Sequence, residues 1–463
     1  MKADSQAADE KARAENEPDG VKRTTESARL FAQALEVIAS GVNSTARTPR
    51  SGWSPYPLFV DHGKGSRIFD VDGNEFVDYL LGLGPMLLGH CPRPVNKAVI
   101  EFIRRRGTVF ALPVADEIEL ARKLIAAVPS VEQMHLATSG TEAVLYALRL
   151  ARAYTRRKKI IRFEGMYHGF SDSVYWSKHP PLEAAGPDSQ PVPVPQGPGM
   201  PEGLENSLII LPWNDGEILE RTIRRYGDQI AAVITEPVMC NTGCILPEPG
   251  YLELMRSLTR ESGIVLVFDE VITGFRVALG GAQQYYGVTP DLTVMAKGFG
   301  GGFPVAAVGG KKEIMQLVAD GIVSVAGTYS GNGIAVSAAN ATLDFLKTPS
   351  IYRKLFKMSE ALMLGISKRL ESAGLSVSVV GIGPLFQVWF TDSPIRNYRD
   401  AVRYARKDLF RIWWEAMMKR GVLFHPHAFE NLFVSFAHNE TDVEFTLKAV
   451  ESALPELKLR MRG

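Results

Sequence analysis

The sequence predicts an α/β protein with a large domain, built on a mainly parallel, doubly wound sheet, and a smaller α+β domain formed by the N- and C-terminal segments. Two observations support this prediction. Short apolar runs alternate with helical patterns from about residue 91 to 345, and beyond about residue 350 long helices surround a few apolar runs. Strands separated by helices are typical of a parallel sheet covered by helices on both faces.

The chain of 463 residues is longer than one hydrophobic core usually organises, so we divide it into four parts. These are a disordered tail (1–28), an N-terminal segment (29–90), a large domain (91–345) and a C-terminal small domain (346–463). The tail is predicted because the first residues are polar and charged, without the apolar run of a signal peptide or membrane anchor.

The elements are expected in the following order. Residues 66–80 alternate apolar and polar side chains on both sides of Asp72-Gly73, which predicts an antiparallel hairpin. The large domain is expected to contain seven strands, at QMHLAT, KKIIRF, SLIILPW, IAAVITEP, IVLVFDE, LTVMAK and PVAAVGG. The small domain is expected to contain helices over 351–372, 399–420 and 440–453, around the apolar runs SVSVVG, LFQVWF and LFVSFAH.

Residues 173–205 are too rich in proline and glycine for a helix or a central strand, so they are predicted to form a long loop. A loop of this length inside a compact domain is either a lid over a functional site or a solvated excursion. No catalytic residue type stands out within it, and both alternatives stay open.

Composition excludes several classes of partner. The 52 Lys and Arg residues balance 51 Asp and Glu residues, which gives a formal net charge of +1. The protein therefore has no overall positive field that would attract nucleic acid or an anionic membrane. No apolar stretch approaches the roughly 20 residues that cross a bilayer. Cys91, Cys240 and Cys244 are too few for a disulfide framework and lack the partners of a zinc site. We therefore expect a cytoplasmic protein without a bound metal.

Charged residues follow two of the predicted strands. The strand IVLVF brings Asp269 and Glu270 to its carboxyl end, and LTVMA ends at Lys297 before the flexible run GFGGGFP. Open α/β sheets bind ligands at this edge, and a lysine desolvated in a pocket becomes a nucleophile for carbonyl groups. Taken singly, each feature could equally be a solvated loop residue.

A further strand breaks at LATSGTEA and enters a strongly patterned helix. Backbone amides and hydroxyl groups of Ser139, Gly140 and Thr141 could bind a phosphate at the start of this helix, where the helix dipole favours an anion. The alternative is an ordinary helix cap, with Glu142 completing it. Both can hold at once.

Other polar and aromatic residues end neighbouring strands. Tyr167 and His168 follow KKIIRF, and the ring of Tyr167 could stack on a flat cofactor. Glu236 ends IAAVITEP, with Asn241 shortly after, and Thr328 precedes a later helix. Together with the lysine, the acid and the phosphate turn, these residues predict one pocket at the carboxyl edge of the sheet. The fingerprints of a dinucleotide site and of a P-loop are absent from the sequence.

The motifs SGTEA, FEGMYHG, EPVMCNTG, DEVITGFRVALGGAQQYYGVTPDLTVMAKGFGGGFPVAAVGG, GTYSGN and FTDSPIRNYRDA occur in one order along the chain. In these motifs the sequence resembles the class III, fold-type I aminotransferases that depend on pyridoxal phosphate (PLP), and within them the glutamate-1-semialdehyde 2,1-aminomutases. The resemblance runs from about residue 35 to 455. It implies the fold of the PLP-dependent transferases, PLP as cofactor, and a homodimer with shared active sites.

The resemblance also implies roles for individual residues. Lys297 would hold the cofactor as a Schiff base, and Asp269 would contact the pyridine nitrogen and keep it protonated. Tyr167 would stack on one face of the ring and Val271 would pack on the other, whereas His168 is expected to be structural. The phosphate would be bound by the turn at 139–141 and by Thr328 of the neighbouring subunit.

Substrate recognition is expected to depend on five positions. Arg47, in GVNSTAR, corresponds to an arginine that binds the substrate carboxylate in the aminomutases. Asn241 and Glu430 also fall on aminomutase active-site positions. Two residues depart from that pattern, because Leu83 replaces a tryptophan and Ser324 replaces a tyrosine.

These departures favour ordinary transamination, since amino transfer within one substrate requires that the intermediate does not escape. The leading prediction is therefore an aminotransferase that moves an amino group from an amine or amino acid donor to a keto acid or aldehyde acceptor. The alternative is glutamate-1-semialdehyde 2,1-aminomutase, which gives 5-aminolevulinate.

Overall fold

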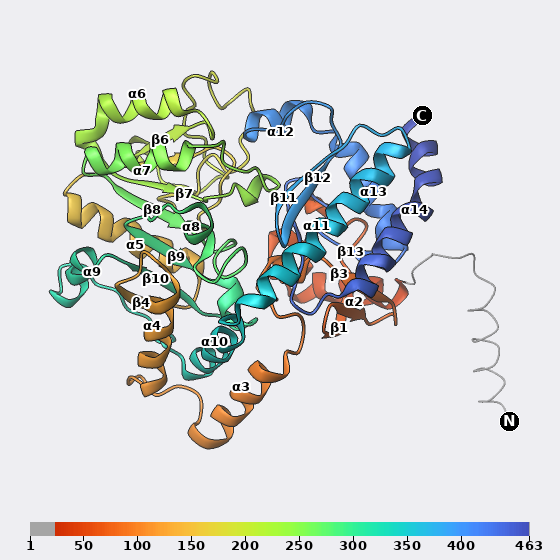
Figure 1. Cartoon of the computed structure of the whole chain (residues 1–463), viewed down its shortest axis with the longest axis horizontal. Coiled ribbons are helices and arrows are strands. Elements are labelled where there is room, and N and C mark those ends of the chain that lie inside the picture. Colours follow the sequence, from red (N-terminus) through yellow and green to blue (C-terminus); the bar gives the residue numbers. More distant parts are fainter. Residues whose placement is uncertain (1–23, 463) are drawn as a thin grey trace.

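The computed structural model describes residues 24–462 (Figure 1). Its large sheet has seven strands in the spatial order β4-β10-β9-β8-β7-β5-β6. The strands are β4 (Gln133–Ala137), β5 (Lys159–Phe163), β6 (Leu208–Leu211), β7 (Ile230–Thr235), β8 (Val265–Asp269), β9 (Leu292–Met295) and β10 (Ala306–Gly310). Neighbours from β9 to β6 pair in parallel, whereas β10 is antiparallel to both β4 and β9. All seven predicted strands and the mainly parallel sheet are confirmed.

Alternation along the strands explains why both faces are covered. Ile160 of β5 packs into a core with α5 (Gly140–Thr155) and α9 (Lys312–Ala319). The next residue, Ile161, packs into a separate core with α6 (Gly216–Tyr226) and α7 (Tyr251–Glu261). The latter face also carries α3 (Arg93–Arg106), α4 (Ala115–Ala127) and α10 (Gly333–Leu346), which pack against Met295 and Ala307. Successive side chains of a strand point to opposite faces, so the sheet is doubly wound.

A second body lies beside the large sheet and combines both ends of the chain (Figure 1). Its four-stranded sheet joins β1 (Val60–Lys64), β2 (Arg67–Asp70), β3 (Glu75–Asp78) and β13 (Val422–Leu423). Its three-stranded sheet joins β11 (Ser378–Ile382), β12 (Leu385–Trp389) and β14 (Leu432–Phe433). The predicted hairpin is β2-β3, and β3 pairs in parallel with β13 from the C-terminal segment. The boundaries predicted near residues 90 and 345 remain predictions.

The remaining helices are α2 (Thr25–Val37), α8 (Gly281–Tyr286), α11 (Pro349–Ser372), α12 (Tyr398–Tyr404), α13 (Lys407–Lys419) and α14 (Glu440–Arg462). In the described range, 24–462, none of the helices is long and apolar enough to cross a membrane.

Three sequence expectations need correction. The tail predicted over 1–28 ends too late, because α2 begins at Thr25, where the Asp72 carboxylate accepts hydrogen bonds from the amides of Glu26 and Ser27. Most of that tail lies outside the described residues. The helix predicted over 399–420 is two helices, since the backbone is extended at Ala405. The last helix continues beyond 453, through Pro455.

The predicted loop at 173–205 contains no strand or helix up to Leu204, apart from one bridge between Trp176 and Pro195. Two buried arginines, one from the large sheet and one from α12, hold it in place. Arg162 of β5 donates to the carbonyl oxygens of Val174 and Trp176. Arg399 of α12 donates to the carbonyl oxygens of Ala185 and Gly186 and forms an ion pair with Asp188.

Candidate active site

A cavity of about 180 Å³ opens at the carboxyl edge of the large sheet. Nine of the predicted site residues line it, namely Gly140, Thr141, Tyr167, His168, Glu236, Asn241, Asp269, Val271 and Lys297. They come from the ends of β4, β5, β7, β8 and β9, which reach this edge together because the sheet runs mainly parallel. The structure thus brings together the residues that the motifs had grouped. Their roles remain predictions.

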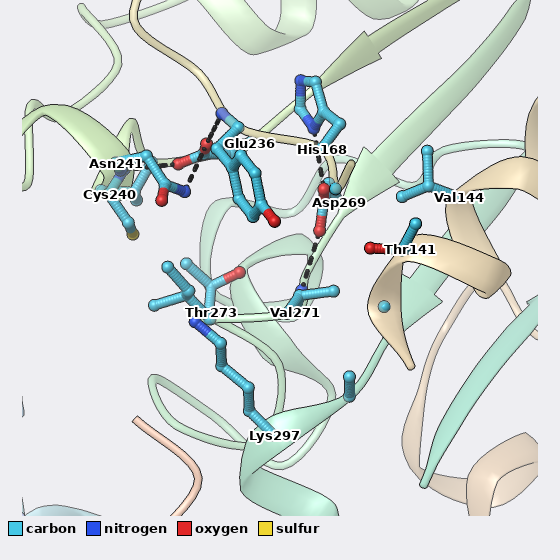
Figure 2. Close-up of a pocket in the computed structure, with 16 residues that line it drawn as sticks. Thr141, Val144, His168, Glu236, Cys240, Asn241, Asp269, Val271, Thr273 and Lys297 are labelled. Atoms are coloured by element: carbon cyan, nitrogen blue, oxygen red, sulfur yellow. Dashed lines mark hydrogen bonds and ion pairs between the residues drawn. The ribbon is translucent and has the colours of Figure 1, made fainter. Parts of the chain in front are cut away.

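Lys297 is the second residue after β9, and its side chain extends into the cavity towards Thr273 (Figure 2). Its φ of 47° is in the left-handed region, which a residue with a side chain adopts only when its surroundings require it. In the part of the chain described, no hydrogen bond or ion pair joins its ammonium to another residue. Burial lowers the pKa of Lys297, while Glu430 and Asp269 oppose that shift.

Asp269 ends β8 and is almost completely buried. Its Oδ2 lies 2.7 Å from Nδ1 of His168, and its Oδ1 accepts a hydrogen bond from the amide of Val271 at 3.1 Å (Figure 2). The imidazole therefore orients the carboxylate, which agrees with the structural role expected for His168. The neighbouring Glu270 points elsewhere, because its carboxylate accepts hydrogen bonds from the amides of Ala282 and Gln283.

The turn before α5 is a helix cap, and its role as a phosphate site remains a prediction. Oγ of Ser139 accepts a hydrogen bond from the amide of Glu142, and the Glu142 carboxylate accepts from the amides of Thr138 and Ser139. Ser139 is thereby engaged in the cap and does not line the cavity. Gly140 and Thr141 do line it, at the positive end of the helix dipole.

Glu236 organises the opposite wall. Its Oε1 accepts hydrogen bonds from the amide of Tyr167 and from the side-chain amide of Asn241, and its Oε2 accepts from the amide of Cys240 (Figure 2). Burial raises the pKa of Glu236, so the group holds its proton to a higher pH than an exposed glutamate does. These contacts fix Tyr167 and Asn241 relative to each other.

The remaining five predicted positions lie outside this cavity. Arg47 and Leu83 line a second, largely apolar cavity of about 440 Å³, together with His425 and Trp53. Glu430 is half-buried, and its charge acts on Lys297.

Ser324 and Thr328 are exposed and lie away from the cavity of their own chain. This placement leaves the predicted contribution of Thr328 to a neighbouring subunit untested.

Sequence reasoning missed a cluster of one lysine and three buried or half-buried histidines beside the site, formed by Lys178, His179, His425 and His427. The His179 imidazole lies 2.9 Å from the carbonyl oxygen of Asn241 and stacks on His427. These residues lie in the sequence runs KHPP (178–181) and FHPHAFE (424–430). The first run belongs to the proline-rich loop, in which no catalytic residue type stands out from the sequence.

Comparison with known proteins agrees with the geometry. A family model described as aminotransferase class-III matches residues 50–437. Glutamate-1-semialdehyde 2,1-aminomutase 2 of Brevibacillus brevis is 44% identical over 429 residues, which cover 92% of this chain and 98% of that protein.

Solved structures are similar over comparable lengths. An omega-transaminase from Sphaerobacter thermophilus is 35% identical with a TM-score of 0.88, covering 93% of this chain and 97% of its own. A glutamate-1-semialdehyde-aminomutase from Pseudomonas aeruginosa, solved in complex with PMP, is 27% identical with a TM-score of 0.84, covering 93% and 94%.

Proposed function

The chain belongs to the class-III aminotransferases, enzymes that use pyridoxal phosphate, and we propose that it transfers the amino group of a small substrate that carries a carboxylate. The observation that carries this proposal is the meeting of Lys297 and Asp269 in one cavity with Gly140 and Thr141 at the start of α5. An amine, a carboxylate and a helix N-terminus at one sheet edge suit this chemistry.

The residues present fit the cofactor. A Cβ at position 140 would lie 3.1 Å from a methyl group of Val271. Because Gly140 has no side chain, its backbone can lie close to Val271, the residue expected to pack on one face of the cofactor ring. The amides at the start of α5 suit a phosphate, the Asp269 carboxylate suits a protonated ring nitrogen, and the Lys297 amine suits an aldehyde. When bound, PLP supplies an electron sink for the bond that breaks at the amine-bearing carbon.

The chain's own groups would then divide the work. Lys297 would release the cofactor to the incoming amine and carry the proton between the substrate carbon and the cofactor carbon. His168 would hold Asp269 in place, and Tyr167 would pack against the ring. Arg47 would bind the substrate carboxylate, for which a guanidinium offers two parallel donors.

Overall similarity favours glutamate-1-semialdehyde 2,1-aminomutase as the first candidate for the reaction. Relatives with that name are 42–44% identical over nearly the whole chain. They support the aminomutase, the alternative drawn from the motifs, better than a general aminotransferase, which the motifs had placed first.

Aminotransfer between two separate substrates is the second candidate, and pocket residues favour it. Leu83 leaves the cavity beside Arg47 apolar and without the tryptophan expected of aminomutases. The similarity to an omega-transaminase supports the same candidate.

One pair of assays separates the candidates. An aminomutase converts glutamate-1-semialdehyde to 5-aminolevulinate and gives no half-reaction with external amines and keto acids. An intermolecular aminotransferase gives both half-reactions and converts the semialdehyde poorly. Lys297→Ala serves as the control that should lose either activity, and a Lys297→Ala enzyme with full turnover would contradict the whole proposal.

We also propose that the enzyme acts as a homodimer. Phe170 and Tyr329, beside the predicted site residues Tyr167 and Thr328, are 61% and 60% exposed. Phe170 also contacts the rings of Tyr167 and Tyr175, and a contiguous apolar surface of this kind beside a site is suited to cover by a second subunit. Sedimentation of the purified enzyme at several concentrations tests the assembly, and a monomer at all of them would contradict it.

A further inference from the structure

Lys178 lies at the rim of the active site, yet neither the cofactor nor the proposed role of Arg47 uses it. Its Nζ lies 4.8 Å from the centre of the Tyr167 ring, and Tyr167 lines the cofactor cavity. The side chain is half-buried, and no hydrogen bond or ion pair to another residue in 24–462 satisfies its ammonium. An ammonium that lies over an active-site ring without a carboxylate partner is suited to an anionic ligand.

The backbone holds Lys178 firmly in this position. The preceding residue, Ser177, is fully buried and has a φ of 47°, a conformation that a serine adopts only under constraint. Its amide donates to the Val194 carbonyl at 2.7 Å, and its carbonyl accepts from the Gly165 amide at 3.1 Å. The following residue, His179, is bonded to Asn241 on the other side. The backbone on both sides of the half-buried Lys178 is therefore fixed by hydrogen bonds.

The neighbouring imidazoles are neutral and add no positive charge to that of Lys178. Nδ1 of His425 accepts a hydrogen bond from the amide of His427, and Nδ1 of His427 accepts from the amide of Phe429, which are contacts of neutral rings. Burial lowers the pKa of His425, His427 and His179, and the charge of Lys178 lowers all three further. Glu430 acts on the same two histidines of the C-terminal segment, but its charge also acts on Lys297.

A second cation borders the same cluster. His425 lies 3.3 Å from the carbonyl oxygen of Ala46, and Arg47 lines the apolar cavity that His425 also lines. The charge of Lys178 also acts on His425. His425 therefore neighbours both cations, because it lines the cavity of Arg47 and responds to the ammonium of Lys178.

We propose that Lys178 binds a carboxylate of the substrate and that, with Arg47, it adapts the site to a dicarboxylic amino acid or keto acid. The inference rests on the proposed amino-transfer function and deepens it. It favours transfer between two substrates, because glutamate-1-semialdehyde carries a single carboxylate.

The test measures binding of unreactive acids to the PLP-loaded enzyme by calorimetry, with glutarate as the dicarboxylate and pentanoate as the matched monocarboxylate. Wild-type enzyme should bind glutarate about 10-fold more tightly, as expected for one charge-assisted hydrogen bond. Lys178→Gln should reduce that preference to about twofold or less, and Lys178→Arg should retain most of it. Pentanoate binding should change less than about twofold in either variant.

Lys407 provides the matched control, since its ammonium also acts on His179 and His427 but lies over the Phe429 ring instead of Tyr167. Lys407→Gln should leave the glutarate preference intact. Equal binding of both acids by wild type, an unchanged preference in Lys178→Gln, or an equal loss in Lys407→Gln would each overturn the inference. Turnover measured in parallel keeps the two proposals apart, because an enzyme that transfers amino groups without preferring glutarate contradicts only the role of Lys178.

Discussion

The buried contact between His168 and Asp269 gives the sharpest quantitative prediction. We expect His168→Phe to lower kcat and to weaken cofactor binding, because the Asp269 oxygen would lose a hydrogen bond of 2.7 Å in a site closed to water. A hydrogen bond to a charged group contributes about 1.5–3 kcal/mol, which corresponds to a loss of roughly 10- to 100-fold. His168→Asn, whose amide can replace Nδ1–H as donor, should recover part of the loss.

The chain offers a control with the same chemistry in a different environment. His62 and Asp61 form a contact of 2.8 Å, but their side chains are 57% and 65% exposed. His62→Phe should change neither kcat nor cofactor binding by as much as twofold, since exposed ion pairs contribute little. The assay is single-turnover kinetics combined with titration of the cofactor-free protein with PLP. Full activity and affinity in His168→Phe, or an equal loss in His62→Phe, would refute the reasoning.

Three further outcomes are expected. Arg399→Met should destabilise the fold by about 3–5 kcal/mol, since it leaves Glu164 buried without its partner. It should also expose residues 173–205 to proteases. An unchanged midpoint of urea unfolding would argue against this prediction. In cofactor-free protein, the rate at which Lys297 reacts with added PLP should rise with pH and level off below the ordinary lysine pKa of about 10.4, because burial lowers its pKa; a midpoint at or above that value would contradict this. Gly169→Ala should weaken PLP binding by at least about 10-fold, because the new Cβ would lie 2.6 Å from Oγ1 of Thr141. Gly199 has a similar φ but no atom within 4 Å of the position of a Cβ, so Gly199→Ala should leave PLP affinity unchanged.

Strands and the core of the site were predictable because they depend on local pattern. Each of the seven apolar runs is bounded by turn residues, and parallel pairing then brings their carboxyl ends to one edge. Asp269 and Lys297 could be placed in one pocket by that topology alone. The resemblance to the family motifs added the expected role of each residue, with Lys297 at the aldehyde and Asp269 at the ring nitrogen of the cofactor. Hydrophobic periodicity carries no information of this kind.

Features that depend on distant partners were not predictable. The start of α2 depends on the Asp72 carboxylate, which lies in a hairpin far along the chain. The break between α12 and α13 is followed by an Arg406 amide that donates to the Phe390 carbonyl, so tertiary contacts decide where the helix stops. Lys178 was missed for the same reason. The composition of a proline-rich loop does not reveal distant contacts, such as that of Arg162 with the Val174 carbonyl oxygen, which hold the loop beside the site.

The parallel pairing of β3 with β13 has a consequence for how the protein is made. The two strands are separated in sequence by the whole large sheet, so the small sheet that borders the apolar cavity beside Arg47 cannot close until Val422 and Leu423 have been synthesised. The large sheet, whose strands all lie between them, can collapse earlier on the ribosome. In a chain stalled before Val422, the residues that line the cofactor pocket would therefore already be in place. The N-terminal segment would still expose apolar surface, because its partner strand β13 would be missing.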